Sequence, residues 1–263
     1  MRKWLHSVYE WLRTWASAGP QKSDQDVFFA NYMALRQAVG WVGTLLPIIL
    51  LVVNPIALSI ENSGCAVVPG SVSGYYYLPV RNIFVGALCA LGLFLIAYVG
   101  YDFGDRLVTD AAGLFALGVA FCPTAPTVVS PPAVPSVACQ TVAQLSTREQ
   151  VVGYIHLVCA ALMFVFLAWM AIRFTNTNNP TPQKLRRNRI YNICAAVIIL
   201  CLVAAAITSP LPASVKAHFP WWLFLYEAVA IFAFGVSWFV KGQTLIGALK
   251  DPPAPVPEPA VQH

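Results

Sequence analysis

Residues 151–174 read VVGYIHLVCAALMFVFLAWMAIRF, an apolar run in which His156 and Arg173 are the only basic side chains. A helix needs about 20 predominantly apolar residues to cross the ~30 Å hydrocarbon core of a bilayer. Five more runs of similar length occur, at residues 39–60, 82–100, 107–129, 190–208 and 220–240. The sequence therefore predicts an all-α fold, a polytopic six-helix transmembrane bundle.

The composition agrees with a membrane domain. The chain has 263 residues, of which 58% are hydrophobic and 10% charged, and its mean hydropathy is +0.66. Soluble domains carry about 25% charged residues, so these charges are too few to cover a soluble globule. We expect one six-span domain at residues 19–245 and no separate soluble domain.

The two terminal segments have a different character. In residues 1–18, Trp4, Trp11 and Trp15 recur at helical spacing among basic residues, which predicts an amphipathic helix in the membrane interface. Packing of this helix on the protein's own cytoplasmic surface is the alternative. Residues 246–263 include PPAPVPEPAVQH, and we expect a disordered, proline-rich cytoplasmic tail.

The positions of the basic residues predict the orientation. With a cytoplasmic N-terminus, the outer segments hold Arg81, Arg148 and Lys216, and the other 13 of the 16 Lys and Arg residues lie inside. The positive-inside rule favours this arrangement, and we expect a multi-pass protein of the cell inner (plasma) membrane with both termini cytoplasmic. The basic segment 184–189 (KLRRNR) is predicted to be an inner loop that contacts anionic lipid headgroups, not nucleic acid.

The seven cysteines fall into two groups. Cys65 and Cys139 lie in the two long outer loops, where an oxidising compartment permits a disulfide between them. The other five lie in the predicted spans and are interpreted as small packing residues. No Cys/His cluster has the spacing of a metal site, so we predict no metal and no cofactor.

Ionisable side chains inside a bilayer are costly and are functional candidates by default. At ~1.5 Å per residue, His156 and Glu227 would both lie roughly 8–10 Å below the outer surface. We hypothesise an outward-facing ligand pocket near these two residues; its members are His156, Glu227, Arg81, Asn82, Tyr154 and Tyr226. A structural His156–Glu227 hydrogen bond that joins two helices is the alternative.

A second polar cluster is predicted at the inner side. It consists of Asp102, Asp105, Arg106 and Asp110. Arg106 and Asp110 have the i,i+4 spacing of an ion pair on one helix face. The whole acidic turn could lie against KLRRNR, so a structural role is favoured over a proton path.

Only residues 100–106 connect the second and third spans. With so short a connection, these two spans are expected to pack as an antiparallel hairpin. Small residues let helices approach closely in lipid. Those on the facing sides are Gly86, Ala90 and Gly92, and Ala112, Ala116 and Ala120.

Several chemistries are excluded by the motifs. No Walker motif, nucleophile elbow or dinucleotide fingerprint is present, and a single histidine within the spans is too few for a zinc hydrolase. We predict no catalytic residue. The favoured function is binding or organising a lipid or an apolar small molecule near the outer leaflet. A small proton-coupled transporter using His156 and Glu227 comes second, and an intramembrane enzyme third.

Three segments carry a resemblance to known proteins: YYYLPVRNIFVGALCALGLFLIAYVGYDFGD, RNRIYNIC and EAVAIFAFGVSWFVKG. They resemble bacterial six-span membrane proteins without an assigned activity, and their arrangement is loosely similar to the Frag1/DRAM/Sfk1 group. That group is associated with lipid organisation and membrane trafficking. The resemblance covers the spans and their order, and implies a lipid-related role without assigning any site residue.

Overall fold

The computed structural model describes residues 24–61, 68–100, 102–128, 141–142, 144–175, 181–216 and 218–242. The predicted helix at 1–18, the predicted pair Cys65–Cys139 and the tail 246–263 lie outside these residues. The chain divides into two units, residues 1–34 and 35–263. Of the first unit, the described part is the first turns of one helix, and the account below concerns the second unit.

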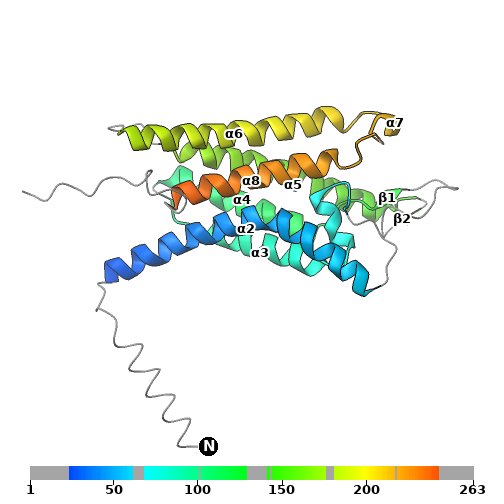
Figure 1. Cartoon of the computed structure of the whole chain (residues 1–263), viewed down its shortest axis with the longest axis horizontal. Helices are drawn as coiled ribbons and strands as arrows, with labels where there is room; N and C mark the ends of the chain where they lie inside the picture. Colours follow the sequence, from blue (N-terminus) through cyan, green and yellow to red (C-terminus); the bar gives the residue numbers. More distant parts are fainter. Residues whose placement is uncertain are drawn as a thin grey trace, which may run out of the picture. The chain divides into compact units, whose positions relative to one another are not determined.

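The described residues are almost entirely helical, as predicted (Figure 1). The helices are α2 (Asp24–Ile60), the short 3-10 helix η1 (Val72–Tyr77), α3 (Arg81–Ala97), α4 (Phe103–Phe121), α5 (Thr147–Arg173), α6 (Pro182–Thr208), α7 (Ala213–Lys216) and α8 (Trp222–Lys241). A parallel pair of two-residue strands, β1 (Thr127–Val128) and β2 (Thr141–Val142), accompanies them.

Four helices are long and apolar enough to cross a membrane. They are α5, α6, α8 and the part of α2 at Asn31–Ile60. The remaining two candidates are shorter or more charged: α3 has 17 residues, and α4 has 19 residues that include Asp105, Arg106 and Asp110. The chain therefore has the helices of a membrane protein.

Two predicted boundaries were wrong, and local chemistry explains both. The segment KLRRNR is not a loop but the first turns of α6, because the Thr181 side chain caps that helix by accepting from the Lys184 N–H at 3.2 Å. Pro182 suits a first helical turn. The third apolar run does not continue to residue 129, because α4 ends at Phe121 and Pro123 cannot continue a helix.

A capping box marks the start of α5. The Ser146 side chain accepts from the Glu149 N–H, and the Glu149 carboxylate accepts from the Ser146 N–H at 2.8 Å, which forms a complete capping box. Such a cap satisfies two backbone N–H groups that a helix start leaves without partners.

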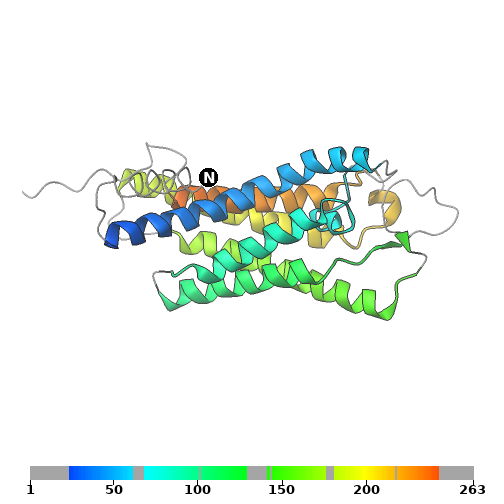
Figure 2. The same cartoon turned by 90° about the horizontal axis from the view of Figure 1, so that it is seen from below.

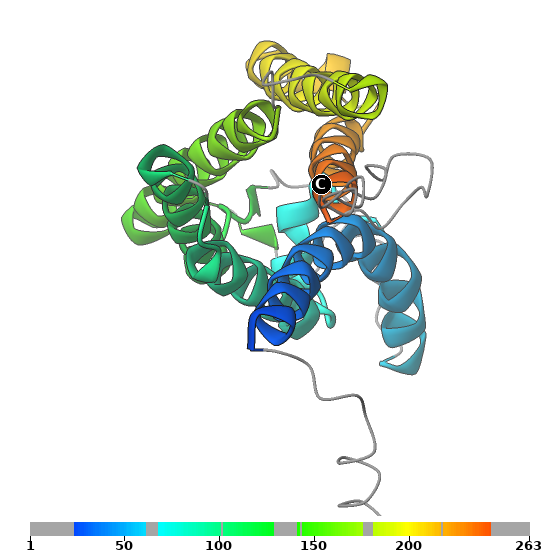
Figure 3. The same ribbon diagram turned by 90° about the vertical axis from the view of Figure 1, so that its left-hand side faces the viewer.

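The helices of the second unit follow one another around the bundle, as the end-on view in Figure 3 shows. The pairs α3–α4, α4–α5 and α5–α6 are neighbours, and α8 packs against α6 and α5. Gly40 and Gly43 of α2 lie against Phe239 and Phe234 of α8. Arg36 of α2 donates to the Tyr98 hydroxyl, next to α3, at 3.1 Å, so α2 lies between α8 and α3.

The α3–α4 hairpin packs through glycines, as the sequence indicated in part. A Cβ atom added to Gly113 would lie 2.5 Å from the Gly92 carbonyl oxygen, so the two backbones are in contact there. By contrast, a Cβ atom on Gly86 would meet no described atom within 4 Å outside its own helix. The predicted packing role of Gly86 was therefore wrong, because Gly86 lies on the exposed side of α3.

The two ends of the bundle differ. One end holds η1, α7 and the β pair; we call it the η1 end (Figures 1 and 2). The other, the Arg173 end, holds the α3–α4 turn and the C-terminus of α8. Near it Trp238 is fully buried, and its ring centroid lies 5.0 Å from Tyr98, 5.2 Å from Phe174 and 6.0 Å from Phe234. These four rings form an aromatic layer across the bundle.

Candidate functional site

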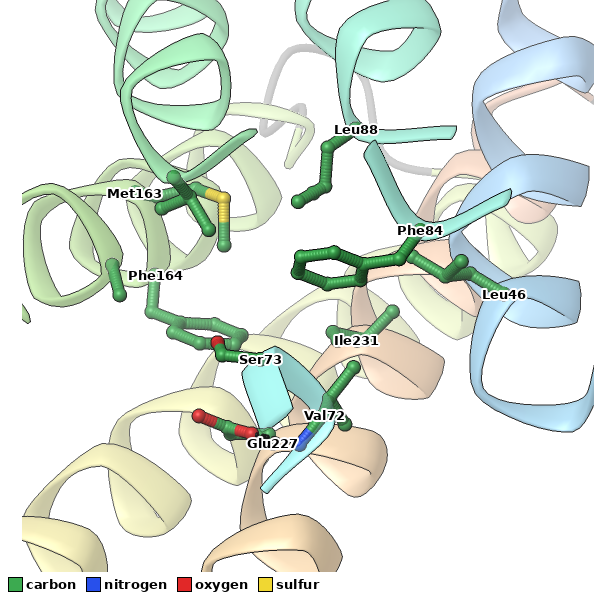
Figure 4. Close-up of a pocket in the computed structure, with 11 residues that line it drawn as sticks. Leu46, Val72, Ser73, Phe84, Leu88, Met163, Phe164, Glu227 and Ile231 are labelled. Atoms are coloured by element: carbon green, nitrogen blue, oxygen red, sulfur yellow. Dashed lines mark hydrogen bonds between the residues drawn. The ribbon is translucent and has the colours of Figure 1, made fainter. Parts of the chain in front are cut away.

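A cavity lies inside the bundle between the aromatic layer and the η1 end (Figure 4). It is lined by Leu46, Val72, Ser73, Phe84, Leu88, Val119, Ala160, Met163, Phe164, Glu227 and Ile231. The space that a water molecule can occupy is about 20 Å³, and ~10–15 Å³ measured in this way is enough for one water. Nine of the eleven lining side chains are apolar, and Glu227 is the one with an ionisable group.

Glu227 connects this cavity to η1. Its carboxylate accepts a hydrogen bond of 2.6 Å from the Val72 N–H and a second from the Ser73 N–H. The first N–H groups of a helix have no partner within the helix, and their positive partial charge favours an anion. At the same end of η1, the hydroxyl of the N-cap Ser71 accepts from the Gly74 N–H at 3.0 Å. Glu227 therefore holds the start of η1 against the wall formed by α8.

The tyrosines of η1 differ in their surroundings. Tyr75 is fully buried and its ring lies 6.2 Å from that of Phe224 in an edge arrangement. Burial raises the pKa of Tyr75 to about 12, so its phenol stays neutral. Tyr77 donates to the Thr124 carbonyl oxygen. The interior contacts of Tyr75 and the hydrogen bonds of Glu227 to the η1 backbone both hold η1 in place at this end of the bundle.

His156 is buried but bonds to a different element. Its Nδ1 lies 2.6 Å from the Cys122 carbonyl oxygen, and the Val119 carbonyl oxygen is its second partner. Carbonyl groups in the last turn of a helix have no partner within that helix, so a buried imidazole on α5 satisfies the C-terminus of α4. The hydrogen bonds of His156 and Glu227 thus go to two separate backbone segments.

The other predicted pocket residues do not line the cavity. Arg81, Asn82 and Tyr154 are exposed; the Arg81 guanidinium donates to the Tyr76 hydroxyl and stands 4.1 Å from the centre of the Tyr76 ring. Tyr226 is half-buried and packs edge-on against Trp222 at 5.9 Å. Of the six predicted residues, Glu227 is the one that lines the cavity.

The predicted inner cluster is organised by Arg173, which the sequence analysis did not select. Arg173 Nη2 lies 2.6 Å from both carboxylate oxygens of Asp102, and its Nε donates to Asp105. Arg106 and Asp110 form the expected i,i+4 ion pair, at 3.6 Å. The Asp105 N–H and then the Arg173 guanidinium hold the pKa of Asp102 below its usual range. Arg173 stands at the end of an apolar run. A basic side chain at that position was the signal in the sequence that could have identified it as a member of the inner cluster.

The apolar lining of the cavity could not be selected from the sequence. Phe84, Met163 and Phe164 have the same side-chain chemistry as the lipid-facing residues of their helices, and only the packing shows which of them face inward. Within the described ranges, no group of three or more His, Cys, Asp or Glu residues is placed to hold a metal ion.

Replacing His156 tests its structural role. We expect His156→Phe to lower the free energy of unfolding by about 1–2 kcal/mol, because the Cys122 carbonyl oxygen would be buried without its donor. Tyr154→Phe on the same helix is the matched control and should change stability by less than about 0.5 kcal/mol, since Tyr154 is 69% exposed. Denaturant unfolding in detergent gives both values. Equal effects of the two changes would contradict the assignment.

No family model, no curated protein and no solved structure matches this chain. The cavity, the Glu227 carboxylate and η1 are therefore the features of the chain that bear on its function.

Proposed function

We propose that this chain is a six-span protein of a bacterial inner membrane that binds a lipid or an apolar small molecule in the cavity beneath η1. In this proposal both termini are cytoplasmic and the η1 end faces the outer leaflet. The observation that carries it is a mostly apolar cavity in the bundle that contains one carboxylate, that of Glu227.

The two shorter helices support six spans. At ~1.5 Å per residue, α3 and α4 are roughly 26 and 28 Å long, close to the ~30 Å of a hydrocarbon core. The charged residues of α4, Asp105, Arg106 and Asp110, lie in its first two turns. At that end they would reach the headgroup region, where charged groups cost little. Both helices also pack side by side and next to the long helix α5.

The lining of the cavity indicates the class of ligand. Its apolar walls suit a hydrocarbon chain, and Phe84 and Phe164 offer aromatic faces. The Glu227 carboxylate suits a hydrogen-bond donor, either a hydroxyl or an ammonium group. A molecule with a short donor head and an apolar body, such as an amphiphile or an apolar amine, matches both features.

A ligand of this size needs η1 to move. The present cavity holds only one or two water molecules, whereas ligand sites usually measure about 300–1,000 Å³. Val72 and Ser73 of η1 are part of the lining, so withdrawal of η1 enlarges the site and frees the Glu227 carboxylate at the same time. The ligand head would then take the place of the Val72 and Ser73 N–H groups.

The resemblance to the Frag1/DRAM/Sfk1 group points to the same lipid-related role. Proton-coupled transport is the second candidate, and one observation favours it. The cavity lies between two closures, the aromatic layer around Trp238 at one side and η1 at the other, and alternating access needs a site between two closures.

Native mass spectrometry of the protein extracted with its own lipids tests the binding role. We expect a discrete bound molecule on the wild type and at least a tenfold lower occupancy in Glu227→Gln, which lacks the negative charge, and in Ala160→Leu, which fills the cavity. Ala206→Leu on the exposed side of α6 is the matched control and should keep the wild-type occupancy.

Three results would separate the possibilities. An adduct that persists in both cavity variants would refute the proposed site. Absence of any adduct on a folded wild type would refute the binding role. Proton-driven uptake of a solute into proteoliposomes that Glu227→Gln abolishes would instead establish the transporter.

A further inference from the structure

Two cysteine side chains occupy the contact between α4 and α5 near the η1 end. Cys122 ends α4, where its N–H donates to the Gly118 carbonyl oxygen at 2.9 Å. Cys159 lies in the first half of α5, and both residues are half-buried. The sequence predicted only a packing role for these two cysteines, and neither lines the proposed ligand site.

Gly118 brings the two cysteines together. A Cβ atom added to Gly118 would lie 2.6 Å from the Cys159 sulfur, so that sulfur rests directly on the α4 backbone. Cys122 is the C-cap of α4 and has an extended backbone, and its N–H bond to the Gly118 carbonyl oxygen keeps it one turn from Gly118. The Cys159 sulfur therefore lies within about one helical turn of the Cys122 backbone.

His156 fixes the position of Cys122 relative to α5. The 2.6 Å contact between His156 Nδ1 and the Cys122 carbonyl oxygen joins the two helices one turn from Cys159, because residues 156 and 159 share a face of α5. The contact of the Cys159 sulfur with Gly118 and that of the Cys122 carbonyl oxygen with His156 therefore hold α4 and α5 together at the two cysteines, where a disulfide would need their backbones to be close.

From this geometry we infer that Cys122 and Cys159 form a reversible dithiol–disulfide pair that links the end of α4 to α5. The oxidant class is a disulfide compound. One cysteine thiolate attacks it, a mixed disulfide forms and the first thiol leaves. The second cysteine thiolate then attacks the mixed disulfide; the Cys122–Cys159 bond forms and the second thiol leaves. Two electrons pass to the oxidant, and its two leaving thiolates take the two thiol protons.

Packing cysteines and a dithiol pair differ in how they react. Two independent thiols would each keep a mixed disulfide, whereas a neighbouring thiol displaces it. A closed disulfide would also restrain the unfolded chain and raise thermal stability. This pair would make the packing at the η1 end depend on the redox state of its compartment, whether or not the cavity binds a ligand.

Oxidation by glutathione disulfide tests the pair. The full chain with Cys65→Ser and Cys139→Ser, purified in detergent, is reduced, shown to melt cooperatively, and incubated in glutathione redox buffers before the free thiols are alkylated. Peptide mass spectrometry should find a Cys122–Cys159 crosslink, and the intact protein should lose two hydrogen atoms. The crosslinked protein should melt at a higher temperature than the reduced protein.

Single-cysteine variants complete the test. Cys122→Ser and Cys159→Ser should each lose the crosslink and accumulate a glutathione adduct on the remaining partner, while Cys89→Ser on α3 should keep the wild-type crosslink. The inference is overturned if both thiols of the folded parent protein carry glutathione separately or stay free. It is also overturned if Cys122 or Cys159 links preferentially to another cysteine.

Discussion

Gly235→Ala should lower the free energy of unfolding by about 3 kcal/mol or more, the upper end of the range for overpacking. The added Cβ atom would lie 2.2 Å from the Thr44 Oγ1, 2.9 Å from the Thr44 backbone nitrogen and 3.0 Å from the Gly40 carbonyl oxygen. Two of these three atoms belong to the α2 backbone, so rotation of a side chain cannot relieve the contact. The helices α2 and α8 must move apart, and denaturant unfolding in detergent measures the cost.

Two further variants separate the causes of this effect. Gly86→Ala adds the same methyl group where no described atom outside α3 lies within 4 Å, and it should stay within about 0.5 kcal/mol of the wild type. Thr44→Ala combined with Gly235→Ala should recover only part of the loss, because the backbone contacts remain. A Gly235→Ala protein as stable as the wild type would show that α2 and α8 are not in backbone contact.

Arg173→Met should lower the free energy of unfolding by about 2–3 kcal/mol. Arg173 bonds to both Asp102 and Asp105, and the Asp105 side chain is only 10% exposed. Removing one partner of a buried ion pair costs ~3–5 kcal/mol, and the 28% exposure of the Arg173 side chain reduces this value. Methionine keeps the apolar stem, so the loss reports mainly the guanidinium contacts.

The pH dependence provides an independent readout. A carboxyl group whose pKa is lower in the folded state stabilises the fold above its unfolded pKa of ~3.9, and that stabilisation is lost as the pH falls through the folded pKa. Asp102 is such a group. Wild-type stability should therefore fall below about pH 4, and Arg173→Met should show a smaller fall. Arg106→Met, which removes an exposed i,i+4 pair, should cost under about 0.5 kcal/mol. Equal losses in the two variants would contradict a special role of Arg173.

Helix formation was predicted well because its signals are local. An apolar run of about 20 residues is a property of the run itself, and so is a cap such as that formed by Ser146 and Glu149. The two errors were also local in origin. The charge of KLRRNR suggested a loop, but the cap at Thr181 starts α6 before this segment. The apolar run at 107–129 suggested a helix to its end, but Pro123 cannot continue α4 beyond Phe121. The depth expected from the sequence drew attention to His156, which is buried, and to Glu227, which is half-buried and lines the cavity.

The partners of these two residues could not be predicted. Glu227 accepts from a backbone N–H that is 155 positions away in the chain, and His156 pairs with a backbone carbonyl oxygen. Every residue except proline carries both backbone groups, so residue types do not reveal which one a side chain will meet. For the same reason, no pattern in the sequence predicted that η1 would lie between α3 and α8.

The sequence by itself determined that this is a helical membrane protein, because hydrophobic length and charge density act on each segment separately. It also located the side chains that are costly to bury. Only the tertiary structure decided the order of helices around the bundle, the cavity beneath η1, the ion pairs of Arg173 and the contact of the Cys159 sulfur with Gly118. These features depend on which faces of apolar helices touch, and in a bilayer a lipid-facing and a core-facing apolar side chain have the same chemistry.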